Sequence, residues 1–262
     1  MPKPFKKLTS AAAIETVLSK VPAYRVGLPS RDSIVAVTDT PELRILHTEE
    51  VDRYDKGALG LGLAGPPPAA APSGDNFTGT DRKAAKLSIS TAKMENFKDV
   101  KDVIASLVSE SQMKAHQPKI KTTATSGRVK EEDRNVHVNA FIYAASRESD
   151  NDFHLIVGRD ASAKPDMYMT AELSGLPPAG SDSFAQLQAA RDAFKAFFNN
   201  RAGGSLPGSS YDFYDPPLAV TVEGSLFFDI THISGSRPGP ASLKSRMPVI
   251  WELHPVSKIV FK

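Results

Sequence analysis

The stretch SFAQLQAARDAFKAFF, residues 183–198, decides the fold that this sequence predicts. Its apolar side chains recur at steps of three and four residues, which indicates a helix with one buried face. These side chains are Phe184, Leu187, Ala190, Phe194 and Phe197. Ser183 followed by Gln186 is a capping-box pattern and predicts where the helix begins. The Asn- and Gly-containing residues 199–204 predict where it ends.

Segments typical of β-strands lie on both sides of this helix. Residues 136–146, 154–160 and 167–176 precede it, and residues 218–232 and 249–262 follow it. They are apolar or alternating runs, rich in β-branched and aromatic residues and separated by turn-forming residues. Three strands, one helix and two further strands is the order of an OB-like β-barrel, in which the helix caps the open end. An open α+β sheet would give the same pattern.

We therefore predict an α+β, mainly β fold: a C-terminal five-stranded OB-like β-barrel with one capping helix, and an N-terminal α/β extension. The barrel domain would span residues 135–262. In the extension, residues 1–56 predict a helix and a small strand pair, and residues 57–80 form a Pro/Gly-rich linker or loop. Residues 81–134 combine a helical segment at 97–110 with a polar linker.

Composition limits the classes of protein and of site. The 262-residue chain is 40% hydrophobic and 24% charged, as in ordinary folded proteins. It has no cysteine, which excludes disulfides, thiolate metal sites and cysteine nucleophiles. A net charge of +2 gives no strong field toward nucleic acid or an anionic membrane. An uninterrupted apolar run of about 18 residues is lacking, so we expect no membrane partner and a cytoplasmic location.

The C-terminal half, about residues 136–262, carries the ordered segments DFHLIVGRD, MYMTAEL followed by PP, AARDAF, VEGSLFFDITH and WELHPVSKI. In their order and spacing, these segments resemble an uncharacterised bacterial protein family. That resemblance implies a fold neighbourhood and little chemistry. The long N-terminal extension and the loop ISGSRPGPASLKSRMP after His232 depart from the family's pattern. The strand order also resembles that of staphylococcal-nuclease-like domains, in topology alone and without the spacing of that family's motif.

Acidic and imidazole side chains fall on the predicted strands or at their ends. In the closing strand, Glu252 and His254 alternate with Trp251 and Leu253, so the two polar side chains share one face. If the strands pair as predicted, several such side chains converge. The candidate catalytic residues are His154, Glu172, Asp229, Glu252 and His254. The candidate metal ligands are His154, His232, His254 and Glu252.

Imidazoles and carboxylates can hold zinc or another divalent ion and leave an open position for water. The ion would lower the pKa of that water and generate a hydroxide nucleophile. This pattern allows a nuclease-like, metal-dependent phosphodiester hydrolase. A spacing of two is also what any half-solvated strand offers, so a structural role for these side chains stays open.

A second set of residues suits a binding role. Aromatic side chains on the strand face opposite the apolar positions can stack with bases or sugars, and arginines can contact phosphate. The candidate ligand-binding residues are Phe141, Tyr143, Arg159, Tyr168 and Phe227. Coverage of this face by the N-terminal region is the alternative. The Tyr- and Pro-rich residues 211–217 predict a loop beside it.

The functional prediction is a non-catalytic binding or interaction module without a cofactor. Its expected ligand is single-stranded nucleic acid, on the analogy of the fold, or another extended polar ligand, and a protein is the alternative partner. One alternative is the metal-dependent hydrolase, with a divalent metal ion as cofactor. The other is a structural or assembly subunit.

Overall fold

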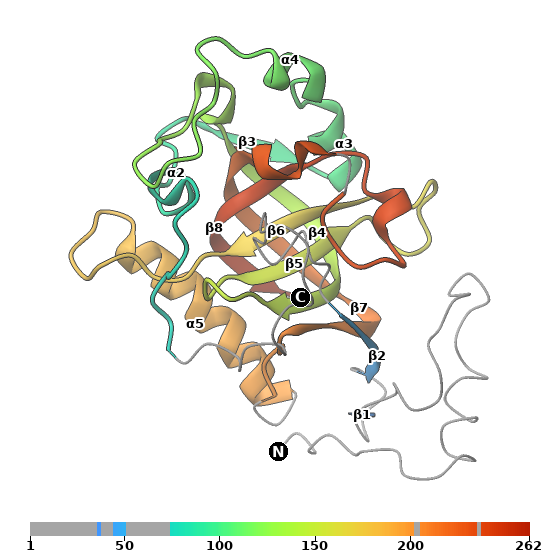
Figure 1. Ribbon diagram of the computed structural model, residues 1–262. Helices are drawn as coiled ribbons and strands as arrows, with labels where there is room; N and C mark the ends of the chain where they lie inside the picture. The colour runs from blue at the N-terminus through green and yellow to red at the C-terminus, as the bar shows by residue number, and fades with distance from the viewer. Residues whose placement is uncertain (1–35, 38–43, 51–73, 202–204, 235–236) are drawn as a thin grey trace, which may run out of the picture.

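The computed structural model describes residues 36–37, 44–50, 74–201, 205–234 and 237–262 (Figure 1). The fold is mixed α+β, and the described residues form eight strands joined in one sheet and few helices. The N-terminal helix that the sequence predicts, and most of the Pro/Gly-rich segment, lie outside the described residues.

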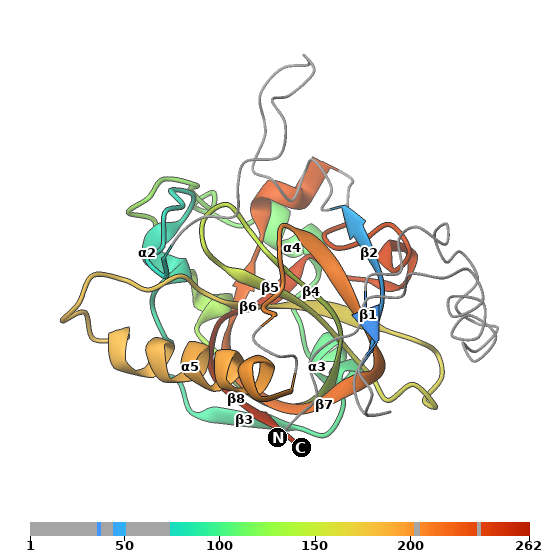
Figure 2. The same ribbon diagram turned by 90° about the horizontal axis from the view of Figure 1, so that it is seen from below.

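All five predicted strands of the C-terminal half are present. They are β4 (Asn135–Arg147), β5 (Phe153–Gly158), β6 (Tyr168–Leu173), β7 (Ser210–Phe228) and β8 (Trp251–Phe261). Each pairs with two of the others, and the pairings close a ring in the order β4-β5-β6-β8-β7 and back to β4 (Figures 1 and 2). The pairing of β6 with β8 is parallel and the other four are antiparallel.

Three further strands extend the sheet: β1 (Ala36–Val37), β2 (Arg44–Glu50) and β3 (Met94–Phe97). β1 pairs with β2 where the sequence predicts a strand pair, and β3 pairs in parallel with β4. β2 pairs with the first half of β7. The loop prediction for residues 211–217 is wrong, because this segment lies within β7. Its strand partners come from distant parts of the chain, and local turn chemistry gave no sign of them.

The main helix is α5 (Phe184–Arg201), at the position that the sequence predicts. Shorter α-helices are α2 (Lys83–Lys86), α3 (Val100–Ala105) and α4 (Glu110–Lys114). Short 3-10 helices are η3 (Lys130–Glu132), η4 (Ile230–Ser234) and η5 (Lys244–Arg246). Among the described residues, the helices are too short or too polar to cross a membrane.

The sequence predicts one helix over residues 97–110, whereas the structure has the end of a strand, a helix and the start of another there. Phe97 ends β3, and the carboxylate of Asp99 accepts a hydrogen bond of 2.7 Å from the amide of Lys101 at the start of α3. Ser109 begins α4 with a capping box. Because each capping residue starts a new helix, the single-helix prediction is wrong.

The main hydrophobic core lies inside the ring of strands. Side chains alternate along each strand, so that Phe153, Leu155 and Val157 of β5 face this core. α5 contributes Ala190, Phe194 and Phe198 to the same core. Burying each such phenylalanine stabilises the fold by about 1.5–3 kcal/mol. Phe197 of α5 also stacks on Phe261 of β8, with ring centroids 3.7 Å apart, and Figure 2 shows the helix alongside that strand.

β7 changes its register with β8 around Gly224. A Cβ atom at this position would lie 2.9 Å from the carbonyl oxygen of Pro255, so only glycine permits the close approach of the two strands. Beyond this point, Phe228 ends β7 and Asp229 follows it directly. The register shift therefore determines where Asp229, the residue after β7, lies relative to β8.

Candidate functional site

The strand register brings the predicted polar residues together. His154 on β5 lies opposite Glu172 on β6. The parallel pairing of β6 with β8 sets Thr170 opposite Glu252, and Glu172 then lies beside His254. These side chains alternate with the core-facing ones, so they share the outer face of the three strands. Because all are nevertheless buried, other parts of the chain must cover this face.

His254 is the centre of the buried part of this face. Its Nδ1 atom lies 2.9 Å from Oε2 of Glu172 and 3.5 Å from Oε2 of Glu252. Its Nε2 atom lies 3.4 Å from Oδ2 of Asp152. All four side chains are at most 4% exposed. Within the described residues, none of these five atoms makes a hydrogen bond, because their angles are unsuitable even where the distance is short.

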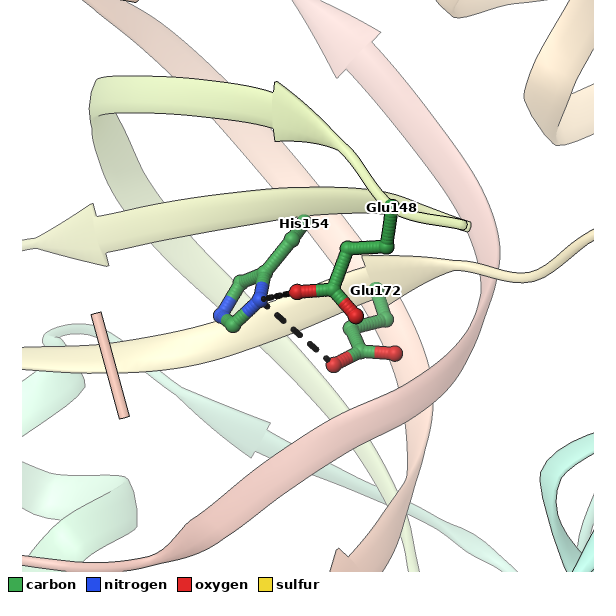
Figure 3. Close-up of side chains that lie close together, drawn as sticks. All are labelled: Glu148, His154 and Glu172. Atoms are coloured by element: carbon green, nitrogen blue, oxygen red, sulfur yellow. Dashed lines mark hydrogen bonds and ion pairs between the residues drawn. The ribbon is translucent and has the colours of Figure 1, made fainter. Parts of the chain in front are cut away.

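Glu148, in the loop between β4 and β5, adds a carboxylate above His154 (Figure 3). Its Oε1 atom lies 2.6 Å from Nδ1 of His154, and Oε1 of Glu172 lies 3.9 Å from the same nitrogen. The other ring nitrogen, Nε2, lies 3.3 Å from the hydroxyl of Thr170. Both nitrogens of His154 therefore have oxygen partners.

Asp229 and His232 complete the set from the segment after β7. The carboxylate of Asp229 accepts a short hydrogen bond from Nδ1 of His232 and another, of 2.9 Å, from the amide of Thr231. Ligand atoms of Asp229, His232 and Glu252 all lie within 4.8 Å of one another. We use the name acid–imidazole cluster for these residues: Glu148, Asp152, His154, Glu172, Asp229, His232, Glu252 and His254.

A cavity of about 240 Å³ opens onto this cluster. Five carboxylate side chains line it: Asp81, Glu148, Asp150, Glu172 and Asp229. Its wall also contains the basic side chains of Arg82 and Lys86 and the imidazoles of His154 and His232. The cavity is therefore acidic and holds several groups that can bind a cation.

Lys86, at the end of α2, belongs to the N-terminal extension and forms part of the cavity wall. Arg82 holds this helix in place, because its guanidinium donates two hydrogen bonds of 2.6 Å to the two carboxylate oxygens of Glu132. The hydroxyl of Ser174 donates a hydrogen bond of 3.0 Å to the carbonyl of Lys86. The ammonium of Lys86 then lies 3.9 Å from the carboxylate of Asp150.

α5 fixes the loop that carries Glu148. The buried guanidinium of Arg191 donates hydrogen bonds of 2.9–3.0 Å to the carbonyls of Asn151, Leu173 and Ser174. The first carbonyl belongs to the β4–β5 loop and the other two to the end of β6. One side chain of the helix therefore ties together two parts of the cavity wall.

Burial and neighbouring charges shift the pKa values of the acids in opposite directions. Burial raises the pKa of Glu148 to about 7, since the charges of Glu172 and Asp150 add to it and His154 opposes it only in part. Burial also acts on Glu172, but the charges of His254 and Lys86 outweigh it and hold the pKa of that carboxyl well below its usual range.

The remaining buried groups follow the same two causes. Burial and nearby carboxylates raise the pKa of Asp152 and of Glu252 well above the usual values. Burial lowers the pKa of His254, against the charge of Glu172. Burial also acts against the charge of Lys86, but the surrounding carboxylates, Glu172 first, raise the pKa of its ammonium well above the ordinary value. The site therefore favours a positive charge.

The aromatic candidates do not form one surface. Tyr143 and Tyr168 meet edge to face with ring centroids 4.8 Å apart, and the hydroxyl of Tyr143 donates to the carbonyl of Arg159. Tyr168 is 5% exposed beneath another arginine side chain. Phe227 is 1% exposed and lines the acidic cavity instead. Phe141, half-buried on β4, pairs across to Gly158 and Ala219.

Sequence reasoning did not select Glu148, Asp152 or Lys86 for the site. Glu148 and Asp152 lie in a polar turn between two predicted strands, and their closeness to His154 depends on how that turn folds back. Lys86 comes from the extension, and the bonds of Arg82 and of Ser174 hold it at the cavity. The sequence signal for this turn is its position between the first two predicted strands of the ring.

Comparisons of the chain with models of protein families, with curated proteins and with solved structures find no match.

Proposed function

We propose that this protein is a binding module built on an OB-like barrel, and that its ligand is a cation held in the acidic cavity. The strand order supports the first part: the ring β4-β5-β6-β8-β7, with α5 between its third and fourth strands along the chain, matches the order of that fold. Burial of three α5 side chains in the ring's core agrees with a helix that caps the barrel.

The position of the cavity supports a binding role. OB folds bind their ligands on the face of the second and third strands, between the first loop and the loop that joins the last two strands. Here those strands are β5 and β6, which carry His154 and Glu172. The two loops supply Glu148 and Asp229 to the cavity wall. This argument rests on fold analogy, so the chemistry of the site must decide the ligand.

One observation carries the choice of a cation: five carboxylates line the cavity. Of the two basic side chains in its wall, Arg82 is already bound at both carboxylate oxygens of Glu132. Lys86 is left to balance several acids, and its raised pKa reflects that excess of negative charge. A phosphate group would meet net repulsion here, which disfavours nucleic acid as the occupant of this cavity.

Titration of the purified full chain with ligands of opposite charge tests the proposal. We expect Zn²⁺, Mn²⁺, Ca²⁺ or spermidine to raise the melting temperature, with heat of binding by calorimetry, and Glu172→Gln to weaken that effect. Glu223→Gln, which changes a glutamate outside the cavity wall, is the matched control. Salt-sensitive binding of a labelled single-stranded oligonucleotide, without any cation effect, would overturn the proposal in favour of nucleic acid.

Metal-dependent hydrolysis is the second candidate function. The volume of the cavity favours it, because about 240 Å³ exceeds the space of an ion and leaves room for water and part of a substrate. A chromogenic phosphodiester with added Mn²⁺ or Zn²⁺ tests this activity directly. Turnover by the wild-type protein that Glu172→Gln abolishes would support hydrolysis. If the wild-type protein turns the substrate over no faster than this variant, hydrolysis is no longer a candidate function.

A further inference from the structure

We infer that the cation is a divalent transition-metal ion held by Glu148, His154 and Glu172, an inference that rests on the proposed cation site. Figure 3 shows the three side chains converging from the β4–β5 loop, β5 and β6. One ligand atom from each lies within 4.8 Å of the others. Two carboxylates and a neutral imidazole supply a formal charge of −2 to a 2+ ion.

The distances fit an ion after small movements. Nδ1 of His154 lies 2.6 Å from Oε1 of Glu148 and 3.9 Å from Oε1 of Glu172. Around tetrahedral zinc, ligand atoms at about 2.1 Å from the metal lie about 3.4 Å from one another. One distance must therefore lengthen by about 0.8 Å and the other shorten by about 0.5 Å. Rotation of the glutamate side chains about their own bonds covers such changes.

The second nitrogen of His154 has the partner that a ligating histidine needs. If Nδ1 binds the ion, Nε2 carries the proton and donates it to an acceptor. The hydroxyl oxygen of Thr170, buried on β6, lies 3.3 Å from Nε2. This contact fixes the ring with Nδ1 directed toward the two carboxylates.

The second oxygen of Glu172 also has an orienting partner. Oε2 lies 2.9 Å from Nδ1 of His254, and a small rotation of either side chain completes a hydrogen bond between them. Nε2 of His254 in turn faces Oδ2 of Asp152 at 3.4 Å. The other carboxylate oxygen of Asp152 accepts a hydrogen bond of 2.6 Å from the amide of Gly175. This chain of contacts has the form of the outer shell that supports metal ligands.

Two other groups of acids and imidazoles fit an ion less well. In the group Asp152, Glu172 and His254, the side chains of Asp152 and His254 are 0% exposed and are not part of the cavity wall. In the group Asp229, His232 and Glu252, Glu252 is 1% exposed and is not part of the cavity wall. Glu148, His154 and Glu172 all line the cavity, so an ion among them is reachable from solvent.

The ligand types indicate the class of metal. An imidazole beside two carboxylates suits Mn²⁺, Fe²⁺, Co²⁺ or Zn²⁺, whereas Ca²⁺ and Mg²⁺ prefer oxygen ligands alone. Because the chain has no cysteine, soft thiolate chemistry does not compete. We expect Zn²⁺ and Mn²⁺ to bind more tightly than Ca²⁺.

Calorimetry on the chelator-treated full chain, with Zn²⁺, Mn²⁺, Ca²⁺ and spermidine as separate titrants, is the first experiment. We expect one Zn²⁺ per chain, and a loss of affinity of at least about tenfold in Glu148→Gln, His154→Gln and Glu172→Gln. His137→Gln and Glu223→Gln are the matched controls, since these residues form a histidine–glutamate pair elsewhere. Unchanged Zn²⁺ affinity in His154→Gln, or Ca²⁺ binding as tight as that of Zn²⁺, would overturn the inference.

A spectroscopic measurement covers the case in which a variant does not fold. Pulsed electron paramagnetic resonance of Mn²⁺ bound to the wild-type protein detects coupling to an imidazole nitrogen. We expect that coupling, and its absence in a bound complex would overturn the assignment of His154. Binding of spermidine without any metal would overturn the metal and leave the cation site standing. Failure of every cation would overturn both proposals.

Discussion

Among the histidine–glutamate pairs of the described residues, two make the same kind of contact in different surroundings. His154 and Glu148 approach to 2.6 Å in the acid–imidazole cluster, and His137 and Glu223 approach to 3.1 Å between β4 and β7. The first histidine is 2% exposed and the second 31%. Burial and nearby acids raise the pKa of Glu148 to about 7. For Glu223, burial has the same sign, but hydrogen bonds from Lys258 and His137 lower the pKa of that carboxyl.

The comparison shows that the identity of two partners does not determine their electrostatics. The pair of Glu223 lies where water screens its charges, and Lys258 supplies a second positive partner to the carboxylate. The pair of Glu148 lies among other carboxylates, with both side chains largely buried in the cavity wall. Ion pairs that solvent screens stabilise a fold weakly. A buried set of side chains with an excess of carboxylates is stabilised by a further positive charge.

The largest expected difference comes from removing each histidine. His154→Ala leaves two carboxylates of a buried cluster without their imidazole, and we expect a loss of about 3–5 kcal/mol in the free energy of unfolding. His137→Ala removes a partly exposed partner and should cost less than about 1 kcal/mol. Urea unfolding at neutral pH measures both. Equal losses would show that the two pairs do not differ as described.

Two lysines of α2 sharpen the role of positive charge in the cluster. Lys86→Gln removes the cation that several carboxylates face, so we expect a loss of roughly 2–3 kcal/mol in stability. The same change should raise cation affinity by roughly three- to tenfold, because one like charge leaves the cavity. Lys83→Gln, on the same helix beside Phe77, is the control and should change neither quantity. Weaker cation binding in Lys86→Gln would contradict the reasoning.

Asp212 on β7 separates the effect of burial from that of pairing. Burial alone raises its pKa to about 7. Folding therefore favours its protonated form, and stability is lost as pH rises from the unfolded value, near 4, through 7. Asp212→Asn removes this penalty, so we expect a gain of roughly 1–2 kcal/mol at pH 8 that shrinks toward pH 4. Thermal unfolding at several pH values measures it, and a gain that is independent of pH would contradict the prediction.

The smallest effect is expected at the exposed pair. Glu223→Gln weakens contacts with His137 and Lys258, and we expect a change below about 1 kcal/mol that 1 M salt largely removes. Unfolding at low and high salt measures this dependence. A large loss that salt leaves unchanged would mean that the pair is not screened by solvent.

The five strands and the main helix of the C-terminal half followed from the sequence because their signals are local. Alternating runs gave the five strands, and the Phe stripe gave α5. Alternation also put Glu252 and His254 on one face, from which their meeting with Glu172 follows once the strands pair. The tyrosine- and proline-rich start of β7 was missed, because its partners β2 and β4 lie far away in the chain.

The site was predictable where strands carry it and unpredictable where loops and the extension do. His154 and Glu172 were found from their strand positions. Glu148 depends on a turn whose geometry several long-range bonds fix, and Lys86 on a buried ion pair between Arg82 and Glu132. Such contacts join residues tens of positions apart, and a single sequence carries no periodic trace of them.

The bonds of Arg191 have a consequence for selectivity. Because this side chain secures the carbonyls of Asn151 and Ser174 from inside the fold, the two segments that supply Glu148 and Glu172 to the cavity wall are preorganised before any ligand enters. Ligand binding then costs little free energy for ordering the protein. A rigid cavity wall also cannot adjust to an ion of unsuitable radius. α5 therefore helps to set the size of the cavity that a bound ion must fit, although it is not part of the cavity wall.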